Sequence, residues 1–191
     1  MTEPSAAYFM LACHSPEEGD HAQYSYEPDD EERSWIIGQP FDVPPPVPVP
    51  VTVEPGEEGL QPELTDVPVP LMSRRLAECL TAAGVSNIDF YPARVTEQAS
   101  GRSHDGLLAF NLIGLVAAAD LSRSTFSAPD GPLLSVDFDG LAIDPAKAGA
   151  ADMFRLAESV NGIVVSRRVR QAILDAGITT LEFILPEDWV G

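Results

Sequence analysis

The chain is poor in the residues that build disulfide frameworks, metal sites and basic surfaces. Its 191 residues include two cysteines, three histidines and 11 lysine or arginine side chains, against 30 aspartates and glutamates. Two cysteines are too few for a disulfide-stapled scaffold, and a reducing cytoplasm suits them. No CxxC or HExxH spacing is present, so we expect no metal and no cofactor.

Long hydrophobic runs are also missing. No stretch approaches the roughly 20 apolar residues that span a bilayer, and the apolar segment at 7–13 has no basic residue before it, as a signal peptide would. A net charge of -19 repels nucleic acid and anionic membranes and attracts basic protein partners. We therefore expect a partner with a basic face, with solubility alone as the other interpretation of the charge.

The acidic residues are concentrated near the N-terminus. Residues 1–70 hold fifteen acidic side chains against Arg33 alone, a balance of -14, whereas residues 71–191 hold fifteen against ten basic ones, a balance of -5. This shift predicts an acidic, proline-rich N-terminal part at 1–66 and an α+β domain at 67–191.

The clearest pattern is a repeat, in which residues 71–90 return 93 positions later as 164–183. In each copy a serine, Ser73 or Ser166, can cap a helix, apolar residues follow at helical spacing, and a glycine can end it. Alternating residues then predict a strand. The repeat therefore predicts two similar helices at about 73–84 and 166–177, each running into a strand. It indicates either a duplication or a common design.

The fold class predicted from these patterns is α+β, a mixed or antiparallel sheet with the two helices packed on it. Apolar runs and alternation predict further strands at 6–13, 35–38, 51–53 (an edge strand), 88–95, 108–116, 133–143 and 153–156. The strand at 108–116 lies in the most apolar stretch, 107–121, for which a helix is the alternative. Polar loops are expected at 14–32, 97–105 and 145–152.

Proline is frequent between residues 40 and 70. Each proline removes a backbone donor, so we expect neither a helix nor a central strand there. The segment 44–50 is typical of polyproline II. It would be either a stiff connector or a docking segment for an interaction adaptor.

Two patterns could carry chemistry. Asp137 and Asp139 share a face of a predicted strand, as paired carboxylates of a small enzyme would, although a solvent-facing side has the same pattern. The Ser-Arg-Arg segments at 73–75 and 166–168 could bind an anionic substrate, or the arginines could pair with the chain's own carboxylates. We expect no catalytic residues.

Several short motifs together resemble a known family. They comprise Tyr8-Phe9-Met10-Leu11, residues 70–84, Phe90-Tyr91-Pro92, Asn111, Asp120 with Ser124, Phe154-Arg155-Leu156 and residues 165–183. The chain resembles an immunity-protein family of bacterial polymorphic toxin systems, numbered eleventh in that catalogue and formerly described as a domain of unknown function. Thr180 departs from it, since the family has a second glycine there.

The resemblance implies an intracellular immunity protein that neutralises a cognate toxin by direct binding. Carboxylates could occupy a basic site on the toxin, and interfaces favour an aromatic anchor beside charges. The predicted partner-binding residues are Glu27, Asp29, Asp30, Glu31, Glu32 and Trp35.

Overall fold

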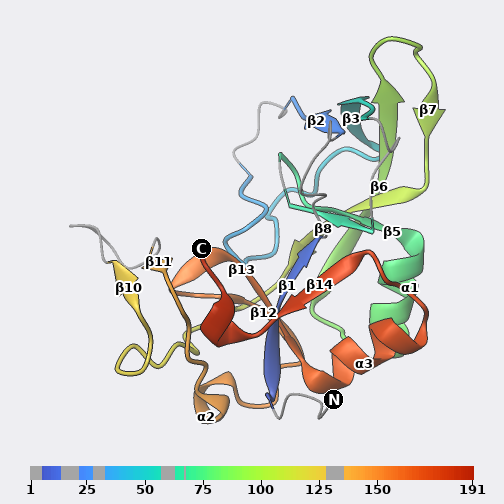
Figure 1. The fold of residues 1–191 in the computed structure, drawn as a ribbon. Coiled ribbons are helices and arrows are strands. Elements are labelled where there is room, and N and C mark those ends of the chain that lie inside the picture. The colour runs from blue at the N-terminus through green and yellow to red at the C-terminus, as the bar shows by residue number, and fades with distance from the viewer. Residues whose placement is uncertain (1–5, 14–21, 28–32, 57–62, 67, 128–135) are drawn as a thin grey trace.

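A computed structural model describes residues 6–13, 22–27, 33–56, 63–66, 68–127 and 136–191. Its described part holds two main β-sheets, with short helices beside them (Figure 1). The five-stranded sheet has the order β14-β1-β13-β12-β9. Its strands are β1 (Tyr8–Cys13), β9 (Leu115–Val116), β12 (Met153–Leu156), β13 (Ser159–Ser166) and β14 (Leu181–Ile184).

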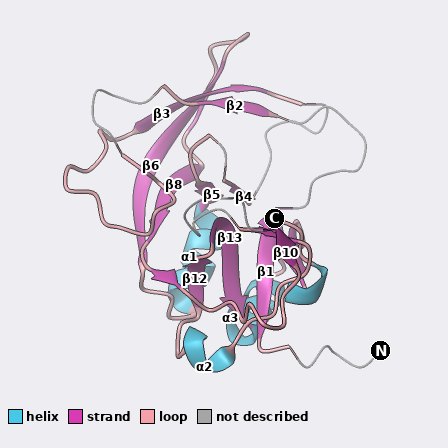
Figure 2. Cartoon of the chain, turned by 90° about the vertical axis from the view of Figure 1, so that its left-hand side faces the viewer, coloured by secondary structure: helices cyan, strands magenta, loops and turns pink. Residues whose placement is uncertain are grey.

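The seven-stranded sheet has the order β2-β3-β6-β8-β5-β4, and β7 pairs with β6. Its strands are β2 (Gln23–Ser25), β3 (Val49–Glu54), β4 (Leu64–Thr65), β5 (Leu71–Ser73), β6 (Ile88–Glu97), β7 (Ser103–His104) and β8 (Leu107–Leu112). In Figure 2, β2 and β3 lie across the top, and the long strand β6 curves down from them.

The repeat forms two helices, as predicted. They are α1 (Arg74–Ala82) and α3 (Arg167–Asp175), each somewhat shorter than expected. The Ser73 hydroxyl accepts from the Leu76 amide at 3.0 Å, and Ser166 accepts from Val169 at 3.3 Å. Gly84 and Gly177 follow at φ +83° and +69°, where glycine avoids the steric cost of a side chain. Local capping signals therefore account for both helices.

The structural repeat extends further than the sequence repeat. β4, β5, α1 and β6 correspond to β12, β13, α3 and β14, because each set is an antiparallel hairpin, a helix and a strand. Each set also encloses one more strand. β8 lies between β5 and β6, and β1 lies between β13 and β14. The second unit is therefore completed by the N-terminus of the chain.

The two helices lie side by side, as Figure 1 shows, and contact one another reciprocally. Arg75 at the start of α1 donates to the Ala176 carbonyl just after α3, and Arg168 at the start of α3 donates to the Ala83 carbonyl just after α1. The helices are thus antiparallel, with each guanidinium at the negative end of the neighbouring helix. Reciprocal contacts of this kind are expected when two units are related by a two-fold axis.

The second arginine of each pair also meets one of the chain's own carboxylates, as one of the two interpretations predicted. Arg75 lies 3.8 Å from Glu63, and Arg168 pairs with Asp152. Each carboxylate also accepts from the capping serine of the same unit. Arg168 and the Ser166 hydroxyl lower the pKa of Asp152. These arginines therefore have structural partners that explain their position in the first helical turn.

The interior contains three apolar clusters. The first holds the buried faces of both helices, including Leu76, Leu80, Val169 and Ile173. The second surrounds Phe138 and includes residues of β1, β12 and β13. It lies beside a small ladder of β10 (Phe126–Ser127) and β11 (Asp137–Phe138), and beside the helix α2 (Pro145–Ala148) and the 3-10 turn η1 (Pro186–Asp188). The third lies beneath β3 and β6 and contains Trp35.

Two predictions for the segment between residues 35 and 53 are wrong. β3 is an interior strand, between β2 and a parallel β6. It tolerates Pro50 because β2 pairs only with residues 52–54, which leaves one flank of Pro50 open. No strand forms at 35–38, since Gly38 turns the chain at φ +68°.

The predicted strands around 108–116 and 133–143 are modified. The first divides into β8 and β9, which belong to different sheets, and Gly114 at φ +102° lies between them. The second is only Asp137–Phe138 within the described residues, and the helix α2 forms where a loop was expected. An aspartate cap and a proline at its first position start α2.

The predicted domain boundary at residue 66 runs through both sheets. β1 comes before it but pairs with β13 and β14, and β3 pairs with β6. An ion pair crosses it as well, since Arg155 on β12 contacts Asp66, which follows β4.

Candidate functional site

One face of the seven-stranded sheet carries small polar side chains. The strand β3 alternates strictly, with Val49, Val51 and Val53 buried and the residues between them exposed. Register places Ser25, Thr52, Thr96 and Ser103 side by side across β2, β3, β6 and β7. The hydroxyls of Thr96 and Ser103 are 3.1 Å apart. We call these four residues the hydroxyl row.

A hollow of about 690 Å³ lies over the same side of the sheet. The residues that line it on this side define what we call the outer face, namely Ser25, Glu27, Thr52, Arg94, Thr96 and Gln98. Glu27 and Glu54 are exposed and have no ion-pair partner in the described part of the chain. Arg94 is already paired, with Asp105 at 3.1 Å. Carboxylates therefore exceed guanidinium groups on this side of the sheet.

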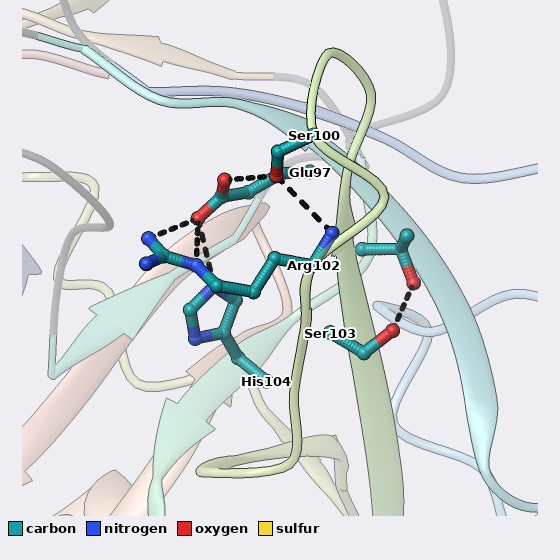
Figure 3. Close-up of polar contacts among 6 residues, drawn as sticks. Glu97, Ser100, Arg102, Ser103 and His104 are labelled. Atoms are coloured by element: carbon teal, nitrogen blue, oxygen red, sulfur yellow. Dashed lines mark hydrogen bonds and ion pairs between the residues drawn. The ribbon is translucent and has the colours of Figure 1, made fainter.

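The opposite side of β6 holds a carboxylate with several donors, shown in Figure 3. Glu97 is 7% exposed. Its oxygens accept from Ser100 Oγ at 2.5 Å, from Arg102 at 2.6 and 3.0 Å, and contact His104 Nε2 at 2.8 Å. Hydrogen bonds from Ser100, His104 and Arg102, in that order, lower the pKa of Glu97 to about 2. We call these four residues the Glu97 network.

The Glu97 network holds the β6–β7 hairpin together. Glu97 ends β6, Ser100 and Arg102 lie in the turn, and His104 belongs to β7. A carboxyl group that stays ionised is a poor general acid, and its lone pairs are occupied, so it is a poor base. The Ser100 hydroxyl donates to Glu97, whose low pKa makes it a weak base for activating a nucleophile. The arrangement is suited to rigidity.

We expect the stability contribution of Glu97 to depend on pH. Its pKa is lowered from 4.5 to about 2 on folding, so the contribution is complete above pH 4.5 and is lost as the pH falls towards 2. Glu97→Gln should therefore be less stable than the wild type at neutral pH, and the difference should shrink in acid. Urea unfolding across this range measures it. The control is Glu54→Gln, and an E97Q difference that stays constant with pH contradicts the prediction.

The predicted partner-binding residues fall into three groups. Glu27 is exposed and lines the hollow. Residues 29–32 lie outside the described residues. Trp35 is 6% exposed and packs edge-on against Phe41, at 4.8 Å between ring centroids, and Tyr91, at 5.8 Å. In this conformation its indole belongs to the interior and supports the sheet from the inner side.

Asp137 and Asp139 are both exposed, as an outward-facing pair should be. A second hollow, of about 480 Å³, is lined by Asp139 together with Arg123 and Glu187 but not by Asp137. A shared acid-base site requires two carboxylates that converge on one hollow. Asp137 and Asp139 do not converge in this hollow.

The Glu97 network was missed by the sequence reasoning, which treated 97–105 as a polar loop. A signal was present, because an acid and two basic residues flank Gly101 within eight positions. Glycine at φ +68° closes the turn, which brings these groups together across the hairpin.

Among the described residues, no group of three histidine, cysteine, aspartate or glutamate side chains is placed to hold a metal ion. No helix in this part of the chain combines the length and apolar character needed to cross a bilayer.

Comparison with known proteins agrees with the resemblance found in the motifs. A search of curated protein sequences finds no match to the chain. The model of the immunity protein family Imm11, in contrast, matches residues 8–187, which is nearly the whole sequence. The chain therefore belongs to the Imm11 immunity protein family.

Proposed function

We propose that this protein neutralises a cognate bacterial toxin by binding it directly, in the cytoplasm of the cell that produces a polymorphic toxin. Membership of the immunity family is the observation that carries the proposal. Inhibition is stoichiometric, and the protein needs no cofactor and catalyses no reaction.

The acidic surface is the second part of the proposal. The first 70 residues have a charge balance of -14, fifteen acidic side chains against one arginine. Such a field attracts a basic toxin from a distance and accelerates association. The contacting residues are Glu27, which is exposed, and the acids that follow it in sequence, Asp29, Asp30, Glu31 and Glu32. Trp35 packs against Tyr26, the residue before Glu27.

The first test is protection and capture. The gene next to the one for this protein is sequenced, and where it encodes a toxin domain, that domain is expressed in a bacterium with and without the full chain. We expect growth only when the protein is present, and co-purification of the two proteins in equal amounts. Protection at a large molar excess of toxin over this protein would instead indicate catalysis and would reject stoichiometric inhibition.

Neutralising the five acids tests the acidic surface. Changing Glu27, Asp29, Asp30, Glu31 and Glu32 to their amides should slow association with that toxin domain about tenfold or more at low salt. The variant should also lose less affinity with added salt, because fewer charges attract the partner. Stopped-flow or surface-binding kinetics measure both.

A matched variant separates local from total charge. It carries the same change at five exposed acids elsewhere, Glu78, Asp137, Asp139, Glu187 and Asp188. Its association rate should fall much less. Equal effects of the two sets would mean that net charge, not this surface, sets the rate.

A further inference from the structure

Resting on the proposed toxin binding, we infer that the toxin docks on the outer face of β2, β3 and β6 and presents lysine or arginine side chains there. The first reason is that no described part of the chain covers this face. Its opposite side packs on the apolar cluster beneath β3 and β6, whereas Ser25, Thr52 and Arg94 are exposed. No described element lies over the hollow of about 690 Å³ on this side.

The second reason is chemical. The hydroxyl row crosses four strands, and neighbouring strands are about 4.8 Å apart, so it presents hydroxyls at regular intervals. Each hydroxyl can donate and accept. Serine and threonine also lose little side-chain freedom when an interface orders them. The row is therefore suited to the peptide and amide groups of a protein surface.

Charge identifies the kind of partner. Glu27 follows β2 and Glu54 ends β3, so these unpaired carboxylates lie at opposite ends of the short ladder. Four residues of extended chain separate them, about 13 Å along the strand. On the helix side, by contrast, Arg75 and Arg168 are paired with Glu63 and Asp152. A basic toxin surface is attracted to the unpaired carboxylates of the outer face.

The Glu97 network prepares this face for binding. It fixes the hairpin that holds Thr96 and Ser103, from the side of β6 opposite to those hydroxyls. Figure 1 shows the hairpin rising beyond the rest of the described fold. Because this projecting hairpin is already ordered, little free energy is lost to ordering it when the partner binds.

The test uses the full chain and the toxin domain whose capture by this protein the first test establishes. Thr52→Arg introduces bulk and positive charge in the centre of the outer face, and Glu27→Lys reverses a charge at its margin without altering a strand. Thr180→Arg is the matched control, because Thr180 is exposed near the end of α3. Circular dichroism and thermal unfolding of each variant establish that it is folded, and calorimetry measures affinity.

We expect Thr52→Arg and Glu27→Lys each to weaken binding about 100-fold, and Thr180→Arg to change it by less than about twofold. Folded T52R and E27K proteins that bind as the wild type does would overturn the docking surface while leaving toxin binding intact. Loss of binding in T180R alone would move the surface to the helix side. Failure of the wild type to bind would instead reject the proposed function, and with it the inference. A dimer of the free protein that T52R dissociates would assign the face to a second copy of the chain.

Discussion

Replacing Asp66 with alanine should lower the free energy of unfolding by about 3–5 kcal/mol. Its carboxylate holds the guanidinium of Arg155 with contacts of 2.6 and 3.1 Å, and Arg155 is completely buried in β12. The Val160 carbonyl accepts one more hydrogen bond from Arg155, at 2.9 Å. Removing Asp66 therefore leaves a buried charge without its counterion. Urea unfolding of the variant measures the loss.

Two further variants isolate the charge. The Asp89 side chain is exposed and has no hydrogen-bond or ion-pair partner among the described residues. Asp89→Ala should therefore lower the free energy of unfolding by less than about 0.5 kcal/mol. Combining Asp66→Leu with Arg155→Met removes both charges and should recover much of the stability lost in D66A. The expectation is contradicted if D66A and D89A are equally stable. The Asp66–Arg155 ion pair joins the two sheets, so its loss should also reduce the cooperativity of unfolding.

Leu80→Ala and Ile173→Ala should each destabilise the protein by about 2–5 kcal/mol. The two residues are 93 positions apart and occupy the same place in the repeat, Leu80 in α1 and Ile173 in α3. Both side chains are fully buried in the first apolar cluster. Truncation removes apolar contacts and leaves a cavity that the close-packed surroundings fill only in part. Thermal or urea unfolding gives both values.

Leu174 supplies the matched control for this pair. It follows Ile173 in the same helix but is 36% exposed. Leu174→Ala should therefore cost less than about 1 kcal/mol, because little apolar contact is lost. Similar losses for L174A and I173A would show that helix propensity dominates over packing. Very different losses for L80A and I173A would show that the two units do not share the core equally.

Local signals in the sequence predicted the elements that depend on near neighbours. Capping serines and terminal glycines located both helices to within two residues, because a cap and its partner are three positions apart. Apolar runs located β1, β6, β8 and β12, because such runs are also a local signal. The family resemblance is confirmed over residues 8–187.

The strand at 51–53 illustrates why other predictions failed. Its proline content predicted an edge position, but the position of a strand depends on which distant segments pair with it. The partner-binding role of Trp35 stays a prediction. Its burial, 6% exposed with Phe41 and Tyr91 around the ring, is likewise decided by packing and not by the charges beside it in the sequence.

The sequence by itself determined the two capped helices, the acidic N-terminal region and the family. Each depends on spacing within a few residues or on composition. Only the tertiary structure decided that β1 completes the second repeat unit, that each helix start meets the end of the other helix, and that Glu97 lies among three donors. These arrangements depend on contacts between residues that are distant in sequence. Burial and hydrogen bonding select such contacts only when the whole chain is packed.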